Sequence, residues 1–158
     1  MTELRVQPLT RVSFAPYGDL IVTEGAEHWP INDGTCERFH DLASVEVGAH
    51  GRALINVFRA LPVALPVRIE ALERHPLGSQ AFVPLNGARY LVVVAAPDAP
   101  DEVVAFLAAG GEGVNYAPGV WHHPLLALDR TSDFLVVDRG GPGDNCDVRT
   151  LPTPRVIR

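Results

Sequence analysis

The sequence contains no lysine, so all 13 of its cationic side chains are arginines. The absence of lysine excludes a Schiff base or a lysine nucleophile. An anionic substrate would have to be held by arginine, by backbone N–H groups or by a metal ion. The net charge is −6 and the arginines form no basic cluster. Nucleic acid is therefore not expected as a partner.

Cysteine is scarce, and long apolar runs are missing. Cys36 and Cys146 are too few for a secreted disulfide framework, so we expect two reduced thiols. Residues 1–8 lack the apolar core of a signal peptide. The longest apolar run, residues 90–96, is far shorter than the roughly 20 residues that a membrane helix needs. We expect a soluble, cytoplasmic protein with no membrane partner.

What the sequence does contain is a series of short segments rich in apolar and β-branched residues. Glycine, proline, asparagine and aspartate separate them, which is typical of strands joined by turns. The segments are residues 53–59, 68–74, 80–85, 90–96, 113–116, 120–128 and 133–138. They predict a mainly β fold, an antiparallel barrel or sandwich.

The chain length fits one domain. We expect this domain to cover residues 3–151, followed by an extended tail over residues 152–158, which contain two prolines. Residues 101–109 begin with acidic residues and end before two glycines, which predicts a short helix. A second short helix is predicted over residues 9–14, with Thr10 as its cap. Residues 90–96 show no polar alternation, so both faces of that strand should be buried, one of them by a helix or a second subunit.

One local pattern stands out, from Glu73 to Gln80. It predicts a strand, a turn and a second strand. Side chains alternate between the two faces of a strand, so Glu73 and His75 should share one face while Arg74 points the other way. Gln80 would begin the second strand. This places a carboxylate, an imidazole and an amide close together.

The spacing resembles the first motif of the cupin superfamily, in which two histidines separated by one residue, and a later glutamate, converge inside a small barrel. Glu73 stands at the position of the first histidine, His75 matches the second, and Gln80 takes the place of the glutamate. The second cupin motif has a histidine three residues after a glycine, and His122 after Gly119 fits it. The asparagine expected four residues later is absent.

These four residues form the candidate site. One carboxylate, two imidazoles and one amide suit a borderline divalent cation such as Ni²⁺, Mn²⁺ or Zn²⁺, with Glu73, His75, Gln80 and His122 as ligands. The alternative is that they line a pocket without holding a metal. Taken singly, a carboxylate on a strand or a hydrogen-bonded histidine is common and needs no function.

The resemblance extends from cupin spacing to one family and covers about residues 4–151. The strings that carry it are similar to those of bacterial ureidoglycolate lyases: YGD (17–19), RFHDL (38–42), ERHPLG (73–78), QAF (80–82), GVNY (113–116), VWHHPL (120–125), DFL (133–135), DRG (138–140) and DNCD (144–147).

The resemblance implies a cupin-like (RmlC-like) antiparallel barrel or jelly roll, with one or two short helices, and a cytoplasmic homodimer. It further implies a carbon–nitrogen (amidine) lyase that cleaves (S)-ureidoglycolate to glyoxylate and urea in allantoin and purine degradation. Ni²⁺ is the favoured cofactor, with Mn²⁺ or Zn²⁺ as alternatives, and no organic cofactor is expected.

The chemistry needs a base at the substrate hydroxyl, an acid at the leaving nitrogen and an anchor for the carboxylate. His75 and His122 either hold the metal or act as base and acid. Glu73 is a ligand or a base, and Gln80 orients the substrate or ligates the metal.

The guanidinium fork matches a carboxylate, and Arg59 and Arg139 are the arginines expected to serve as its anchor. Tyr116 could donate to the substrate or pack in the core. His123 follows His122 directly, so on a regular strand it should face away and serve structure or a dimer contact.

Three other functions stay open. The protein could be a different metal-dependent cupin enzyme, or a non-catalytic barrel that binds a small acid such as glyoxylate. It could also hydrolyse a substrate of the same kind and release ammonia. The products formed, or their absence, separate these functions.

Overall fold

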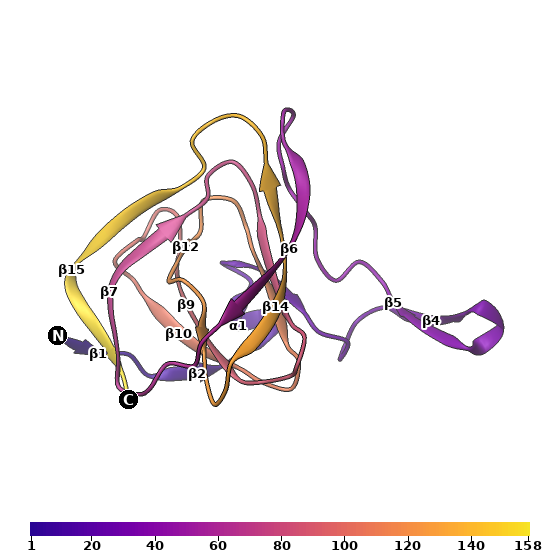
Figure 1. The fold of residues 1–158 in the computed structure, drawn as a ribbon, viewed down its shortest axis with the longest axis horizontal. Helices are drawn as coiled ribbons and strands as arrows, with labels where there is room; N and C mark the ends of the chain where they lie inside the picture. Colours follow the sequence, from indigo (N-terminus) through magenta and orange to yellow (C-terminus); the bar gives the residue numbers. More distant parts are fainter.

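The computed structural model describes residues 1–158 as two sheets, one short helix and a projecting arm (Figure 1). The larger sheet contains β1 (Thr2–Glu3), β2 (Val6–Pro8), β7 (Val67–Arg74), β9 (Tyr90–Ala95), β10 (Val104–Ala108), β12 (Trp121–His122), β13 (Leu126–Ala127) and β15 (Asp147–Ile157). The smaller sheet contains β3 (Gly18–Ile21), β6 (Arg52–Ala60), β8 (Gln80–Pro84), β11 (Gly113–Tyr116) and β14 (Ser132–Gly140). The arm consists of β4 (His28–Ile31), the 3₁₀ turn η1 (Asn32–Gly34) and β5 (Cys36–Phe39), and the helix is α1 (Arg11–Phe14).

The two sheets face each other across the core. The larger follows the order β1-β15-β7-β12-β9-β10-β2, with β13 also on β9, and the smaller follows β3-β11-β8-β14-β6. The larger sheet curls, and most of its strand pairs are antiparallel. Two short strands pair in parallel, β1 with β15 and β2 with β10. The predicted mainly β fold is confirmed, and the arrangement is consistent with a cupin-like fold. No helix is long and apolar enough to cross a membrane.

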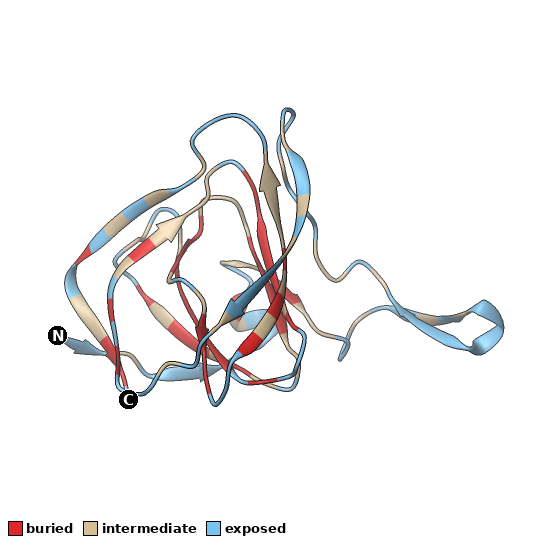
Figure 2. Cartoon of the chain, in the orientation of Figure 1, coloured by how far each residue is buried: buried red, intermediate tan, exposed pale blue.

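Strand β9 divides the apolar interior into two clusters. Its alternate residues Tyr90, Val92 and Val94 pack in the core between the sheets. The intervening residues Leu91, Val93 and Ala95 pack in a second cluster on the other face of the larger sheet. All six residues of β9 are buried (Figure 2). This confirms the prediction of burial on both faces, but the chain itself supplies the cover, through β7, β10 and β15.

The helix predicted over residues 101–109 is wrong. Most of that segment is strand β10, which pairs antiparallel with β9 and parallel with β2. Ala105 and Phe106 are almost completely buried between the two neighbours. Pairing on both edges and burial on both faces outweigh the local acidic start and glycine stop that suggested a helix. The other predicted helix is present as α1, and the Thr10 side chain caps it by accepting from the Ser13 N–H.

The strand predicted over residues 120–128 is interrupted. Only β12 and β13 are paired, and His123, Pro124 and Leu125 lie between them. Proline has no N–H to donate to a ladder, so Pro124 ends the pairing on this side. At the C-terminus, residues 152–157 continue β15 along β7, and Ile157 is buried. The division between a domain to 151 and a tail remains a prediction, but this segment is extended and packed.

Gly18 fixes the distance between β3 and the strand that carries Tyr116. Its backbone lies opposite Tyr116 in the β3–β11 pair, with φ at 143°. A Cβ there would lie 1.9 Å from the backbone oxygen of Asn115. Only glycine allows this approach in this backbone conformation.

Gly18→Ala is therefore expected to lower the free energy of unfolding by about 2–5 kcal/mol, through overpacking and backbone strain. Urea denaturation of the purified protein measures the loss. Gly87→Ala is the matched control, because Gly87 also has a positive φ but no atom within 4 Å of an added Cβ. It should lose only about 1–2 kcal/mol. Equal losses in the two variants would contradict this role for Gly18.

Candidate active site

The end of strand β7 brings three of the predicted residues together. Glu73 lies opposite His122 in the antiparallel pair β7–β12, and His75 follows directly after β7. The Glu73 Oε1 atom is 3.6 Å from His122 Nε2 and 3.9 Å from His75 Nε2. One ligand atom from each of the three residues lies within 4.8 Å of the others. They form a triad with the geometry of a metal site.

Backbone carbonyls set the orientation of both imidazole rings. His75 Nδ1 is 2.7 Å from the carbonyl oxygen of Asn145, and His122 Nδ1 is 3.1 Å from that of Val120. A carbonyl only accepts, so each Nδ1 carries the proton and donates it, and each neutral ring presents a lone pair at Nε2. Metal-binding histidines usually donate the N–H that does not face the metal to a carbonyl or carboxylate in this way.

The two Nε2 atoms are buried and have no hydrogen-bond partner. Two lone pairs and a carboxylate facing one another repel unless a proton or a cation lies between them. If a proton on His122 Nε2 supplies this charge, its hydrogen bond to Glu73 lowers the pKa of the Glu73 carboxyl, against the effect of burial. A divalent cation held by Glu73, His75 and His122 would meet the same need with both rings neutral.

Gln80 lies on β8 and is almost completely buried. Its Nε2 donates to Asp138 Oδ2 at 3.3 Å, and its Oε1 is buried without a partner. Asp138 also accepts from Asn56 Nδ2 at 3.0 Å. The amide oxygen of Gln80 is thus a further acceptor in the same region, and Asp138 and Asn56 are polar residues that the sequence pattern gave no role.

Glu73, Gln80 and His122 line a cavity of about 380 Å³, and His75 is not among its lining residues. Tyr116 stacks on the His122 ring, with ring centres 4.4 Å apart and planes 14° from parallel. Burial, and then the charge of Glu73, raise the pKa of the Tyr116 hydroxyl, which stays protonated at neutral pH. The lining residues are Phe58, Arg59, Ala60, Glu73, Gln80, Phe82, Tyr116, His122, His123, Pro124 and Leu125.

His123 was expected to face away from the site, and this expectation is wrong. It lines the same cavity as His122. The alternation rule fails because the paired strand ends at His122, so His123 follows the turn toward Pro124. Burial lowers the pKa of His123, and its Nδ1 is 2.8 Å from the Pro124 carbonyl.

The three arginines considered from the sequence lie in different places. Arg59 lines the cavity, but its guanidinium makes two hydrogen bonds to Asp133, at 2.8 and 3.0 Å. Arg139 is not part of the lining: it donates to the backbone oxygens of Val47 and Pro142. Arg74 pairs with Asp147 and lies over the ring of Trp121, on the opposite face from Glu73 as strand alternation predicts.

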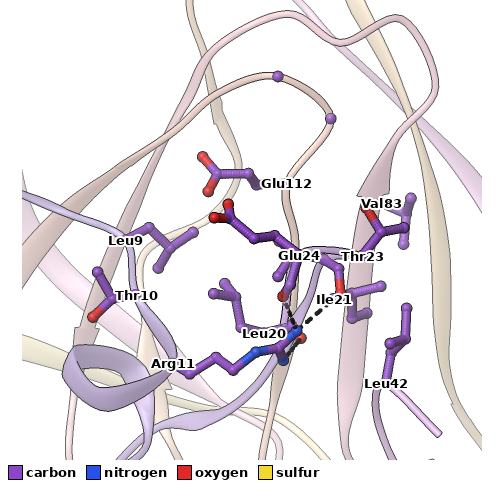
Figure 3. Close-up of a pocket in the computed structure, with 13 residues that line it drawn as sticks. Leu9, Thr10, Arg11, Leu20, Ile21, Thr23, Glu24, Leu42, Val83 and Glu112 are labelled. Atoms are coloured by element: carbon purple, nitrogen blue, oxygen red, sulfur yellow. Dashed lines mark hydrogen bonds between the residues drawn. The ribbon is translucent and has the colours of Figure 1, made fainter. Parts of the chain in front are cut away.

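A larger cavity of about 670 Å³ lies beside α1 and β3 (Figure 3). The guanidinium of Arg11 donates there to the backbone oxygens of Leu20, Val22 and Glu24. Glu112, at the opposite wall, accepts from the backbone N–H of Ala109. These polar groups brace the walls, and no buried polar atom of this cavity lacks a partner. The smaller cavity is therefore the candidate active site.

Comparison with known proteins identifies the kind of chain that carries this site. The family model described as ureidoglycolate lyase matches residues 1–158. A protein named ureidoglycolate lyase from Burkholderia cepacia is 63% identical over 148 residues, which is 91% of this chain and 84% of that one. Proteins of the same name are 56% identical in Burkholderia mallei (strain NCTC 10229), over 96% and 91% of the two chains, and 58% identical in Brucella melitensis biotype 2 (strain ATCC 23457), over 91% and 87%. Because the family model matches the whole chain and these relatives are more than half identical to it over most of its length, the chain belongs to the ureidoglycolate lyase family.

Proposed function

We propose that this protein cleaves (S)-ureidoglycolate to glyoxylate and urea, as a carbon–nitrogen lyase of allantoin and purine degradation. The observation that carries the proposal is the triad of Glu73, His75 and His122, with two unpartnered Nε2 lone pairs. It opens on a cavity whose volume lies at the small end of the range for small-molecule sites. The family of the chain and its relatives' name supply the substrate.

The reaction requires few groups from the protein. The substrate carries a carboxylate, a hydroxyl and a ureido group on one carbon. Removal of the hydroxyl proton forms the aldehyde C=O bond, the C–N bond breaks, and the leaving nitrogen takes a proton to give urea. The sequence left open whether His75 and His122 hold a metal or act as base and acid. Their grouping with Glu73 favours the metal-holding role, and His123, which lies outside the triad, would then move a proton at the cavity wall.

The donor set fits a divalent cation. Glu73, His75 and His122 would hold it, with the Gln80 oxygen as a weaker fourth ligand. We propose Ni²⁺, with Mn²⁺ or Zn²⁺ as alternatives that the same nitrogen and oxygen ligands accept. Bound there, the cation would supply a Lewis acid that lowers the pKa of the substrate hydroxyl. No organic cofactor is proposed.

For the substrate carboxylate we favour Arg59 over Arg139. Arg59 lines the cavity, and its pairing with Asp133 is exposed, where an ion pair contributes little and is easily exchanged. Arg139 holds two backbone carbonyls and would have to release them. Tyr116 keeps its proton and is placed in the lining to donate it to the substrate in a hydrogen bond.

Product analysis tests the proposed activity directly. Purified protein of known metal content is incubated with racemic ureidoglycolate, and glyoxylate, urea and ammonia are measured. The expected result is equal amounts of glyoxylate and urea, with only one enantiomer consumed. Ammonia in place of urea would mean a hydrolase. Binding without turnover, with Ni²⁺, Mn²⁺ or Zn²⁺ added, would contradict the lyase and favour a binding protein or another cupin enzyme.

His75→Ala tests the triad. Loss of one imidazole ligand should lower kcat/KM at least about 100-fold and weaken Ni²⁺ binding, measured by steady-state kinetics and calorimetry. The fold should persist, because the His75 side chain is only partly buried. His50→Ala is the control, since His50 is exposed and outside the cavity lining. Full activity in a folded His75→Ala protein would remove this site.

We also propose that the protein works as a homodimer in the cytoplasm. The resemblance suggests this state, and the edge strand β6 supports it. Ile55 and Val57 are 78% and 58% exposed and lie opposite Val137 and Leu135 of β14, which makes an apolar outer face on the smaller sheet. An exposed apolar edge strand is a surface that proteins normally cover.

Ile55→Asp places a charge in this face and is expected to weaken the dimer at least about tenfold. Sedimentation equilibrium over a range of protein concentrations measures the dissociation constant. Val12→Asp is the control, because Val12 is 86% exposed but lies on α1. A monomeric wild-type protein, or a dimer equally stable in both variants, would rule out this interface.

A further inference from the structure

The side chain of Gln80 can adopt only one of its two amide orientations. An ionised carboxylate accepts hydrogen bonds and cannot donate them, so the neighbour Asp138 must receive the Gln80 NH₂ group. The amide oxygen is then on the other side, where it is buried and has no partner. The orientation follows from the chemistry of the pair.

Asp138 is itself held from the next strand. Its Oδ1 accepts from Asn56 Nδ2 at 3.0 Å, and its Oδ2 accepts from Gln80 Nε2 at 3.3 Å. The three residues lie on β6, β14 and β8, which are neighbours in the smaller sheet. Both hydrogen bonds are therefore donated to Asp138, one from the strand on each side, and each oxygen of its carboxylate is occupied.

An unpartnered buried oxygen is unfavourable, so a fold retains one where a ligand completes it. Gln80 lines the same cavity as Glu73 and His122. The unpartnered atoms of this region, Gln80 Oε1 and the Nε2 atoms of His75 and His122, are all acceptors. If the amide were reversed, an NH₂ group would face this set and would oppose a cation there.

We propose that Asp138, fixed by Asn56, is a positioning residue that holds the Gln80 amide with its oxygen toward the divalent cation of the active site. This inference rests on the proposed function for the identity of the cation. It assigns to Asp138 no contact with substrate or metal, only control over which atom of Gln80 the cavity presents.

A polarity exchange tests it. In Asp138→Asn, the side chain at position 138 can present either an oxygen or an NH₂ group to Gln80, so the Gln80 amide is no longer held with its oxygen toward the cavity. Ni²⁺ affinity and kcat/KM should each fall roughly 10- to 100-fold. Adding Gln80→Glu to the same protein gives the new NH₂ group a carboxylate to bind, and an oxygen again faces the cavity. The double variant should regain the Ni²⁺ affinity of the wild-type protein.

The outcomes separate positioning from mere structure. Asp129→Asn is the control: Asp129 is an exposed carboxylate paired with Arg89, and this variant should behave as wild type. A folded Asp138→Asn protein with unchanged Ni²⁺ affinity and turnover would overturn the proposal. A double variant that stays as weak as Asp138→Asn would also overturn it, because an oxygen at position 80 would then face the cavity without restoring the Ni²⁺ affinity.

A third measurement is independent of metal and activity. In the NMR spectrum of the metal-free protein, the side-chain NH₂ protons of Gln80 should exchange with water much more slowly than those of Gln7, the one other glutamine, which is exposed. Equal exchange would mean that Asp138 does not hold the amide. If the wild-type protein shows no turnover of ureidoglycolate, the proposed function fails, while the exchange rates and Ni²⁺ affinities still decide the role of Asp138.

Discussion

The site depends on the placement of acceptors with no donor between them. His75 and His122 each donate the N–H of Nδ1 to a backbone carbonyl, and the lone pairs of their Nε2 atoms face the Glu73 carboxylate. Such a set is stable only with a positive charge inside it, whether a proton or a cation. The cavity, the bracing hydrogen bonds and the rigid strands around it are best understood as the means of holding these groups in place. This constraint would give the proposed site its affinity for a cation before any substrate is considered.

The fold supplies this placement through the register of its strands and through hydrogen bonds that fix the turn after β7. Glu73 and His122 meet because β7 and β12 are paired, and β9, buried on both faces, holds β12 from its other side. The turn after β7 is fixed by Asn145, whose carbonyl orients His75 and whose side chain accepts from the backbone of Leu77. Arg139 donates to the backbone oxygens of Val47 and Pro142 beside this turn. Gly78 allows its close approach because a Cβ there would lie 2.7 Å from the Arg139 Cβ.

The sequence predicted most of the strands and the approach of Glu73, His75 and His122, since the motif spacing and the alternation of strand side chains are local properties. It failed where tertiary contacts decide. Pairing on both edges made a strand of residues 104–108, and the short length of β12 turned His123 into the cavity. Asp138 and Asn56 were missed because they act on Gln80 from neighbouring strands, a relation that no spacing along the chain displays. The contacts of Arg59, Arg74 and Arg139 could not be predicted for the same reason, because most of their partners are distant in the sequence.

The most direct test of the account is a crystal structure of the protein soaked with Ni²⁺, with diffraction data collected on both sides of the nickel absorption edge. The account predicts one anomalous peak, at about 2.1 Å from His75 Nε2 and His122 Nε2 and close to a Glu73 carboxylate oxygen, a separation typical of metal–imidazole bonds. A peak at another place, or none at a Ni²⁺ concentration that supports full activity, would contradict the claim that this triad is the metal centre.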